Sequence, residues 1–471
     1  MKKINRLFIM MVLLLSVMTS KAQSDGISLA LLPNSTYSNF YNPALTGESK
    51  FVLSAIVSNI GLSVYNSSVR YKNIYNFADG VPVSINANQF INSLEEHDNM
   101  INANFSIDIL RLGFKVGNLF VDFNWRYKYN TELHYSKDFL GFFINGNGNY
   151  LGYDNPADFS IGADMSLYSE MALGLQYKIN DKLSIGVRPK ILLGTANISV
   201  NDDKTKIYTD ENTYKMTADV NINFQASTIL NVDDVYSFGD FTSHFYDMDT
   251  IIIDEILDAR ENIGFGIDFG ASYTFNEHFG VAAGVYDLGY IKWKKSKVKH
   301  NHKDNVVVND ALIDDFNDLM DMNIDLTDLY TNLVEDVWDN DSIYDGGDYK
   351  TSLKTRIMLQ GYYELTPMLR VTAISQLYYM NEKFRPALTL AYSGSFWNVF
   401  NLTASYTLSR FSNNCVGVGI GFKMKNISVF AVTDNVMIAT KFKASPIEML
   451  TSYKVANARI GFVMTFGNNK K

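Results

Sequence analysis

Apolar and polar residues alternate along many stretches of this chain. Every second residue from Ile263 to Phe275 is apolar, and the positions between them hold Gly, Ser, Thr and Asp268. Residues 119–130 and 416–424 repeat this pattern. Successive side chains of a β-strand point to opposite faces, so a period of two predicts strands with one apolar face and one polar face.

Each segment is about as long as the ~9–11 residues that a tilted strand needs to cross a bilayer. A soluble sandwich would show the same alternation in any one strand. The number of such strands, and the charged residues opposite the apolar stripes, favour a barrel with lipid outside and polar groups in its lumen. We therefore predict an all-β fold: a transmembrane antiparallel up-and-down β-barrel of about 14 strands (between about 12 and 16), with short helices in long extracellular loops.

Six short turn-forming sequences separate consecutive alternating runs. They are Gly117-Asn118, Asn180-Asp181, Asn276-Glu277, Thr366-Pro367, Trp397-Asn398 and Lys425-Asn426. Placing all six at the periplasmic end gives a consistent path with an even number of strands, as single-chain bacterial barrels have. The predicted strands are 51–72, 101–115, 119–134, 165–178, 183–200, 262–276, 279–290, 350–364, 369–380, 385–395, 399–410, 415–424, 427–434 and 455–466.

Some segments depart from the regular pattern. Residues 213–229 also alternate but would break the parity of the path, so we expect a hairpin or strand extension in an outer loop. Pro189 cannot donate a hydrogen bond to a neighbouring strand, which predicts a bulge there, and a phase slip at Leu110-Arg111 predicts a second one. Residues 311–338 and 248–260 show helical periodicity, as a lid over the lumen or as a structural cap, and a third short helix is expected at 88–96.

The chain begins with the features of a secretory signal peptide. Lys2, Lys3 and Arg6 precede an apolar run from Leu7 to Val17, and Ser20-Lys21-Ala22 supplies small residues for cleavage after Ala22. The alternative is a membrane anchor, for which the apolar run is short. The predicted organisation is a signal peptide at 1–22, a periplasmic or in-barrel segment at 23–50, a barrel at 51–466 with loop insertions at 201–261 and 291–349, and a tail at 467–471.

Composition and motifs exclude several classes of function. The net charge of −9 argues against a nucleic-acid partner, and a single cysteine, Cys415, excludes an internal disulfide. No nucleophile, nucleotide-binding or metalloprotease motif is present, so we predict no enzymatic activity and no catalytic residue. His300-Asn301-His302 lies among lysines, and the acidic stretch 339–348 lacks the regular spacing of a calcium loop, so we predict no metal and no cofactor. The lysines between 292 and 303 form either a solvated strand end or a contact with anionic lipid headgroups.

The polar faces of the strands hold the candidates for the lumen lining. They are Asp122, Asn124, Arg126, Lys128, Gln176, Arg188, Lys190 and Asp268. These residues line a passage, or they form a network of salt bridges that plugs it. A barrel of this size is compatible with both, because it is wider than one filled by its own side chains and narrower than a porin.

Two short motifs carry a resemblance to known families. Tyr41-Asn42-Pro43-Ala44-Leu45-Thr46-Gly47 resembles the segment that precedes the first strand in the long-chain fatty-acid transporter superfamily and in outer-membrane barrels of type IX secretion. With Asp287-Leu288-Gly289-Tyr290-Ile291-Lys292-Trp293 and the signal peptide, the chain is similar to an uncharacterised Bacteroidota outer-membrane β-barrel family. The resemblance implies a 14-stranded barrel whose N-terminal segment can lie in the lumen and whose hydrophobic ligands leave sideways. Asn42, Pro43 and Ala44 would then be a positioning element.

These expectations leave three functions open for a protein of the cell outer membrane. The first is binding or passive transport of a hydrophobic small molecule. The second is a docking or shuttle barrel for secreted or surface proteins, associated with type IX secretion or surface-protein attachment. The third is a purely structural envelope protein. Outer-membrane lipid is a partner in all three.

Overall fold

A computed structural model describes residues 26–33, 35–45, 49–78, 81–97, 99–202, 204–228, 259–294, 297–308, 344–345, 347–380, 383–409, 415–441 and 452–467. The predicted signal peptide lies outside the described residues. So do the predicted helix at 311–338 and most of the one at 248–260. Only residues 259 and 260 of the latter are described, as part of a 3-10 turn, η5 (Ala259–Glu261).

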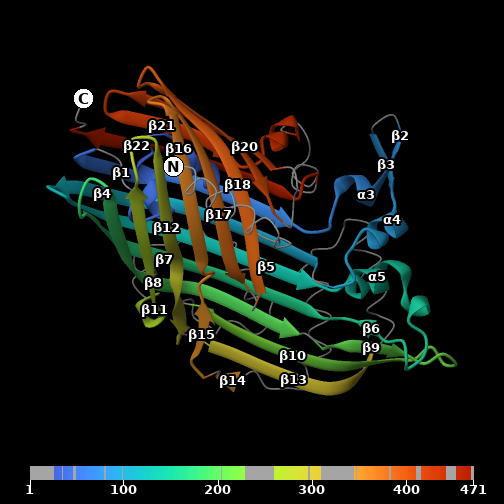
Figure 1. Cartoon of the computed structure of the whole chain (residues 1–471). Coiled ribbons are helices and arrows are strands. Elements are labelled where there is room, and N and C mark those ends of the chain that lie inside the picture. The colour runs from blue at the N-terminus through green and yellow to red at the C-terminus, as the bar shows by residue number, and fades with distance from the viewer. Residues whose placement is uncertain are drawn as a thin grey trace.

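Within the described residues, fourteen antiparallel strands form a closed barrel. The ring closes because β1 pairs with β4 on one side and with β22 on the other. Figure 1 shows the strands running side by side along the barrel. In order they are β1 (Phe51–Asn66), β4 (Asn99–Val116), β5 (Leu119–Tyr135), β7 (Ile161–Lys178), β8 (Leu183–Asp202), β11 (Ile263–Thr274), β12 (Phe279–Trp293), β16 (Arg356–Thr366), β17 (Leu369–Met380), β18 (Lys383–Phe396), β19 (Phe400–Leu408), β20 (Cys415–Met424), β21 (Ile427–Thr433) and β22 (Val455–Phe466).

The predicted fold class is confirmed, and all fourteen predicted strands are found. Those at 369–380, 415–424 and 455–466 have the predicted ends, and the ends of the others are shifted. The first ends at Asn66 instead of residue 72, because the Asn66 side chain accepts hydrogen bonds from the backbone N–H of Ser68 and Val69 and turns the chain. The strand predicted at 350–364 is divided into β15 (Tyr349–Ser352) and β16. Its pairing with β12 is interrupted opposite Asp287, whose φ of 52° departs from extended backbone.

One of the two predicted bulges is correct. The register between β4 and β5 shifts between Asp108 and Leu110, as the phase slip predicted. The prediction at Pro189 is wrong, since Pro189 pairs in register with Ile267 of β11 and the bulge of β8 lies at Thr195. Pairing with β7 is interrupted next to Pro189, but its register is the same on both sides of the gap.

The two ends of the barrel differ. All six predicted turns connect strands at one end, which we call the turn end. The other end, the loop end, carries α3 (Tyr71–Ile74), α4 (Ala87–Asn92) and α5 (Lys137–Asn145), which Figure 1 shows together on its right-hand side. The helix α4 confirms the short helix expected at 88–96. None of the helices in the described ranges is long and apolar enough to cross a membrane.

Additional strands extend the barrel wall at the loop end. The segment at 213–229 forms β10 (Met216–Thr228), which pairs with the end of β8 and with β13 (Lys297–Val308), so the predicted strand extension is confirmed. The remaining short strands are β2 (Tyr75–Ala78), β3 (Val81–Ile85), β6 (Ala157–Asp158), β9 (Lys206–Thr209) and β14 (Tyr344–Asp345). His300 and His302 lie on β13, opposite Phe224 and Ile222 of β10.

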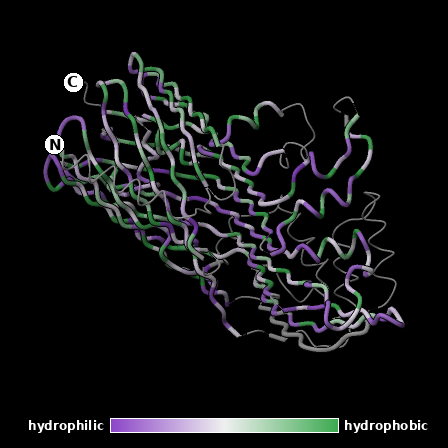
Figure 2. The backbone as a smooth tube through the Cα atoms, turned by 45° about the vertical axis from the view of Figure 1, so that its right-hand side comes forward, coloured by the Kyte–Doolittle hydropathy of each residue, from purple (hydrophilic) through white to green (hydrophobic). Residues whose placement is uncertain are grey.

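Apolar side chains face outward from the barrel wall. Phe265 of β11, Leu390 of β18 and Phe422 of β20 are 56%, 48% and 46% exposed. Asp268, on the opposite face of β11, is 2% exposed. In Figure 2, hydrophobic positions recur along the strands of the barrel body. The alternation in the sequence therefore corresponds to an apolar outer surface and an interior that holds the charged residues.

A plugged lumen as the candidate functional site

The N-terminal segment of the described chain packs inside the barrel. Residues 26–33 and 35–45, which we call the plug, contain α2 (Ile27–Leu31) and the 3-10 helix η1 (Thr36–Phe40). The backbone N–H groups of Ile27 and Ser28 donate to the Asp434 carboxylate at 3.1 and 2.9 Å. The Thr403 hydroxyl of β19 donates to the carbonyl of Leu31 at 3.1 Å. Contacts between residues 372 to 407 positions apart thus hold the start of the plug against the wall.

Apolar packing holds the plug in place. Its buried side chains form one cluster with inward-facing residues of the wall. Burial of a side chain of this size contributes about 1.5–3 kcal/mol. The cluster joins Ile27, Leu29, Leu31, Leu32, Tyr37, Phe40 and Tyr41 of the plug to Val52, Phe120, Tyr286, Met358, Ile374, Ala391, Phe430, Val432 and Val463 of the wall.

Three guanidinium groups surround the ring of Phe40. The central guanidinium carbons of Arg126, Arg188 and Arg111 lie 4.2, 4.6 and 4.7 Å from its centroid, within cation–π range. Arg126 also pairs with Asp108 at 2.6 Å, and Arg188 pairs with Asp122 at 2.8 Å. Charged groups thus pack around the Phe40 ring of the plug without leaving the cations uncompensated.

Arg111 ties the backbone of the plug to β4. It is 0% exposed and donates to the Thr36 carbonyl at 2.6 Å, the Thr36 hydroxyl at 3.1 Å and the Asn39 side-chain oxygen at 3.0 Å. The sequence pattern located a phase slip at this arginine but gave no sign of its partner. The bulge at residue 109 turns Arg111 into the lumen together with Asp108.

The Asn42-Pro43-Ala44 motif lies against a wall of small residues. The Asn42 side chain donates to the carbonyls of Ala283 and Ala271 at 3.1 and 3.4 Å, and it accepts from the N–H of Ala44 at 2.9 Å. A Cβ at Gly186 would lie 2.3 Å from the Pro43 carbonyl carbon, and one at Gly270 would lie 2.1 Å from the Asn42 side-chain oxygen. Only glycine leaves room for the motif at these two positions.

An apolar groove of ≈550 Å³ lies on the outer face of the wall at the same place. It extends from β5 and β7 across β8, β11 and β12 to β16, and the exposed side chains of Ile185, Phe269 and Ile357 form part of its lining. Gly186 and Gly270 belong both to this groove and to the wall beneath the motif. At these two glycines, only the strand backbone therefore separates the groove from the plug.

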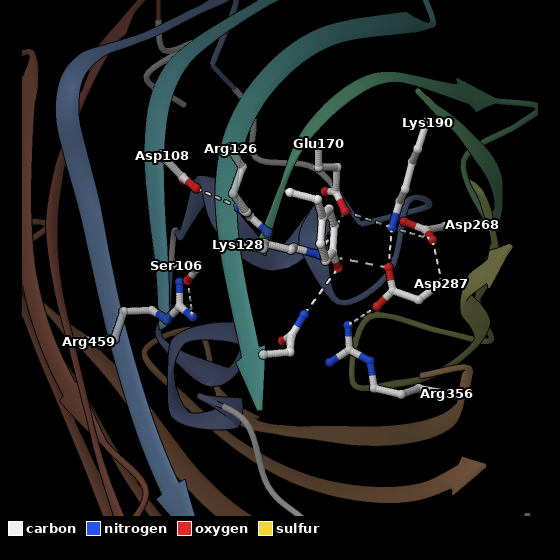
Figure 3. A network of polar contacts seen from close by, with 12 residues as sticks. Ser106, Asp108, Arg126, Lys128, Glu170, Lys190, Asp268, Asp287, Arg356 and Arg459 are labelled. Carbon is white, nitrogen blue, oxygen red and sulfur yellow. Dashed lines mark hydrogen bonds and ion pairs between the residues drawn. The ribbon is translucent and has the colours of Figure 1, made fainter. Parts of the chain in front are cut away.

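A network of buried charges lies next to the plug (Figure 3). The ammonium group of Lys190 is 2.6 Å from Asp287, 2.7 Å from Asp268 and 3.7 Å from Glu170. Lys128 adds a pair with Glu170 at 2.7 Å, and Arg356 adds one with Asp287 at 3.1 Å. These residues come from β5, β7, β8, β11, β12 and β16, so the network joins the strands that carry the groove.

A cavity of ≈130 Å³ lies between the plug and the charge network. Leu29, Phe40 and Tyr41 of the plug form one part of its lining. Strand residues form the rest, among them Arg126, Lys128, Lys354, Arg356 and Arg459. The cavity is therefore lined by aromatic, hydroxyl and cationic groups together with the carboxylates of Asp164 and Asp287.

A separate apolar cluster covers the loop end. Phe142 of α5, Phe159 and Ile207 of β9 pack with residues of β10. Tyr150, beside this cluster, donates to Asp138 at 3.1 Å. Burial, and then the neighbouring Asp138 carboxylate, raise the pKa of Tyr150.

The structure places all eight lumen candidates inside the barrel. Six of them, namely Asp122, Arg126, Lys128, Arg188, Lys190 and Asp268, are in ion pairs. Gln176 donates to the Ala44 carbonyl of the plug. The Asn124 side chain is buried and has no hydrogen-bond partner in the described part of the chain.

Several partners of these residues lie outside the set predicted from the sequence. Asp108, Glu170 and Arg356 are not among the predicted lumen residues, and Asp287 belongs only to the second short motif. Their signal was present, since each is a charged residue on the inward face of an alternating strand. The long-range pairing could not be read, because it depends on which strands are neighbours and on the bulges between them.

The comparisons with known proteins place the sequence in a family. The model of a family of unknown function (DUF5723) matches residues 43–434. The chain belongs to this family. A search of curated proteins finds no match to the sequence.

Solved structures with a similar outline have very low sequence identity to this chain. A Pseudomonas aeruginosa FadL homologue is 10% identical with a TM-score of 0.40, covering 94% of this chain and 96% of the other. The Ralstonia pickettii toluene transporter TbuX is 8% identical with a TM-score of 0.42, covering 92% and 94%. The Pseudomonas putida toluene transporter TodX is 8% identical with a TM-score of 0.37, covering 96% and 99%.

Proposed function

We propose that this protein is an outer-membrane barrel that binds a small molecule with an apolar body and lets it pass when the plug moves. The apolar outer surface supports a position in the membrane, with the turn end in the periplasm and the loop end outside the cell. One observation carries the proposal. The Asn42-Pro43-Ala44 motif of the plug contacts glycines of the wall whose other side lines the apolar groove.

The groove supports a sideways route for an apolar molecule. The inward-facing side chains of the barrel wall form many ion pairs. They disfavour an apolar solute, because such a solute cannot replace the hydrogen bonds of the charged groups. The groove offers the opposite environment and opens to the lipid-facing surface. Movement of the plug away from Gly186 and Gly270 would leave only the paired backbones of β8 and β11 between the lumen and the groove.

A disulfide that fixes the plug tests this proposal. The hydroxyl oxygens of Ser28 on α2 and Ser405 on β19 are 3.3 Å apart, so Ser28→Cys with Ser405→Cys can link plug and wall. Cys415→Ala removes the native thiol. Entry of a radiolabelled alkylbenzene into cells that make this variant should fall to the vector-only rate when oxidised and recover on reduction.

The matched control is Ser28→Cys alone in the Cys415→Ala background, whose uptake should not respond to oxidant. Equal uptake by the oxidised and reduced double variant, with the disulfide verified by mass spectrometry, would show that passage does not need the plug to move.

A second candidate is a docking barrel for a protein at the cell surface. One observation favours it: the β2–β3 hairpin at the loop end exposes Phe77, Val83 and Ile85, which are 41%, 62% and 42% exposed. Apolar side chains grouped on an outer loop are typical of contact surfaces. Phe77→Ser with Val83→Ser should abolish docking and leave alkylbenzene uptake unchanged, whereas a transport role alone predicts no surface phenotype for this variant.

A further inference from the structure

We propose that the central cavity is a binding site for a compact carboxylate, with one ring or a short chain, whose charge is held by Arg459. This inference rests on the proposed function, since it names the class of molecule that the barrel would bind. Three features of the cavity carry it: the sign of the charges that face it, the unusual setting of Arg459, and its size.

The charged groups that line the cavity are mostly cations, and two of them, both lysines, are paired with carboxylates outside the lining. Lys128 reaches back to Glu170, and Lys354 reaches back to Glu132 at 2.8 Å. Both glutamates are about 2–3% exposed and lie outside the lining. The charged groups that line the cavity are Arg126, Lys128, Lys354, Arg356 and Arg459 against Asp164 and Asp287. An anion therefore meets an attractive surface, and a cation meets a repulsive one.

Arg459 differs from the other cations of the cavity. Its guanidinium nitrogens contact only neutral groups, the Ser106 hydroxyl at 3.1 Å and the Asn59 side-chain oxygen at 3.5 Å. In the described part of the chain, no carboxylate pairs with it. Figure 3 shows Arg459 and Arg356 extending from opposite sides of the site, with Lys128 between them. A planar guanidinium with free donor capacity matches the two oxygens of a carboxylate.

The neighbouring strand is shaped to accommodate this arginine. A Cβ at Gly61 of β1 would lie 2.5 Å from the guanidinium carbon of Arg459, so the side chain lies directly over the glycine. Gly26 of the plug has its own Cβ position 3.3 Å from the Arg459 side-chain nitrogen Nε. Arg459 thus sits at the junction of β22, β1 and the plug, where an anion would contact the plug and the wall together.

The size and the rest of the lining limit the anion. A cavity of ≈130 Å³ is close to the roughly 150 Å³ that holds a benzene ring in an engineered protein cavity. Leu29, Tyr41 and Tyr168 supply apolar and aromatic surface for such a body. A long alkyl chain does not fit in this volume, which separates the proposed ligand from a long-chain lipid.

Equilibrium dialysis with the purified full-length protein in detergent tests the proposal. Radiolabelled benzoate is the probe, and benzamide is its neutral counterpart. We expect the wild type to bind benzoate at least tenfold more tightly than benzamide. Arg459→Gln should weaken benzoate binding about tenfold, as the loss of a charge-assisted hydrogen bond predicts, and leave benzamide binding unchanged. The benzoate affinity of Arg459→Lys should lie between those of the wild type and Arg459→Gln, because lysine keeps the charge but lacks the paired N–H donors of a guanidinium.

Arg370→Gln is the matched control. Arg370 lies at the turn end, is half exposed and pairs with Glu364, far from the cavity lining. It should bind benzoate as the wild type does. Equal affinity for benzoate and benzamide, or an Arg459→Gln variant that is folded by its unheated gel mobility and binds benzoate normally, would overturn the proposal. Alkylbenzene uptake that survives in Arg459→Gln would leave the proposed transport function standing on its own.

Discussion

Three arginines pack around the ring of Phe40, and each also forms an ion pair with a carboxylate or a hydrogen bond to a backbone carbonyl. At the scale of single residues, the plug therefore depends on one aromatic ring that is both an apolar contact and a partner for cations. The arginines could not approach each other so closely without this ring and without Asp108 and Asp122 to offset their repulsion.

Phe40→Ala should loosen the plug. Truncation of a buried phenylalanine costs about 3–5 kcal/mol, and here it also leaves three guanidinium groups without the ring. We expect the plug to become sensitive to protease in proteoliposomes while the barrel stays closed. Phe40→Leu, which keeps much of the apolar volume, should show a smaller effect. Equal protection in Phe40→Ala and the wild type would mean that the ring does not hold the plug.

Lys190 is the centre of the charge network, with three carboxylates within 4 Å. Lys190→Met removes the buried cation that Asp268, Asp287 and Glu170 share. Breaking such a buried pair lowers the free energy of unfolding by about 3–5 kcal/mol. Urea unfolding in lipid vesicles, followed by tryptophan fluorescence, should show this loss. Lys178→Met is the control, because Lys178 pairs with a fully exposed aspartate at the turn end and should change stability little. Equal midpoints for the two variants would contradict the network.

The sequence predicted which residues enter the lumen but not how they pair. Alternation along a single strand is enough to place Asp122, Arg188 and Asp268 on the inward face. Pairing needs the neighbours: Lys190 and Asp287 are 97 positions apart and meet because β8, β11 and β12 adjoin. The left-handed backbone of Asp287, which interrupts the ladder and accompanies its position in the network, has no signature in the apolar pattern.

At the scale of elements, the plug and the wall fit each other through small residues. The Asn42-Pro43-Ala44 motif is positioned by hydrogen bonds from Asn42 to two strands and by glycines that allow close approach. The resemblance implied a positioning role for the motif. The glycines Gly186 and Gly270 looked in the sequence like ordinary members of alternating strands, because their partner lies far away in the chain.

Gly186→Ala should displace the motif from the wall. The new Cβ would meet the Pro43 backbone at 2.3 Å, which no side-chain rotation can relieve. We expect faster alkylbenzene entry and easier proteolysis of the plug, with the same unheated gel mobility. Gly148→Ala is the control, since a Cβ there meets nothing within 4 Å. If Gly186→Ala shows the same uptake and proteolysis as the wild type, the contact between Pro43 and Gly186 does not hold the plug in place.

At the scale of the whole molecule, the strand pattern predicts the barrel but not the plug and the charge pairs inside it. A period of two and six turn sequences predicted fourteen strands, since both depend only on local chemistry. The Pro189 prediction failed because a missing donor need not shift the register; a gap in pairing on one side accommodates it. The path of the plug and the closing pair β1–β22 are long-range features, which the apolar pattern of separate strands does not encode.

The central claim is that the apolar stripes of these strands face lipid around a polar, plugged lumen. Fractionation of cells that make a tagged protein, with gel mobility compared before and after boiling, tests it most directly. We predict recovery in the outer membrane and a mobility that changes on heating, as a closed barrel resists the detergent until it is boiled. Recovery as a freely soluble periplasmic protein with one mobility would contradict the account.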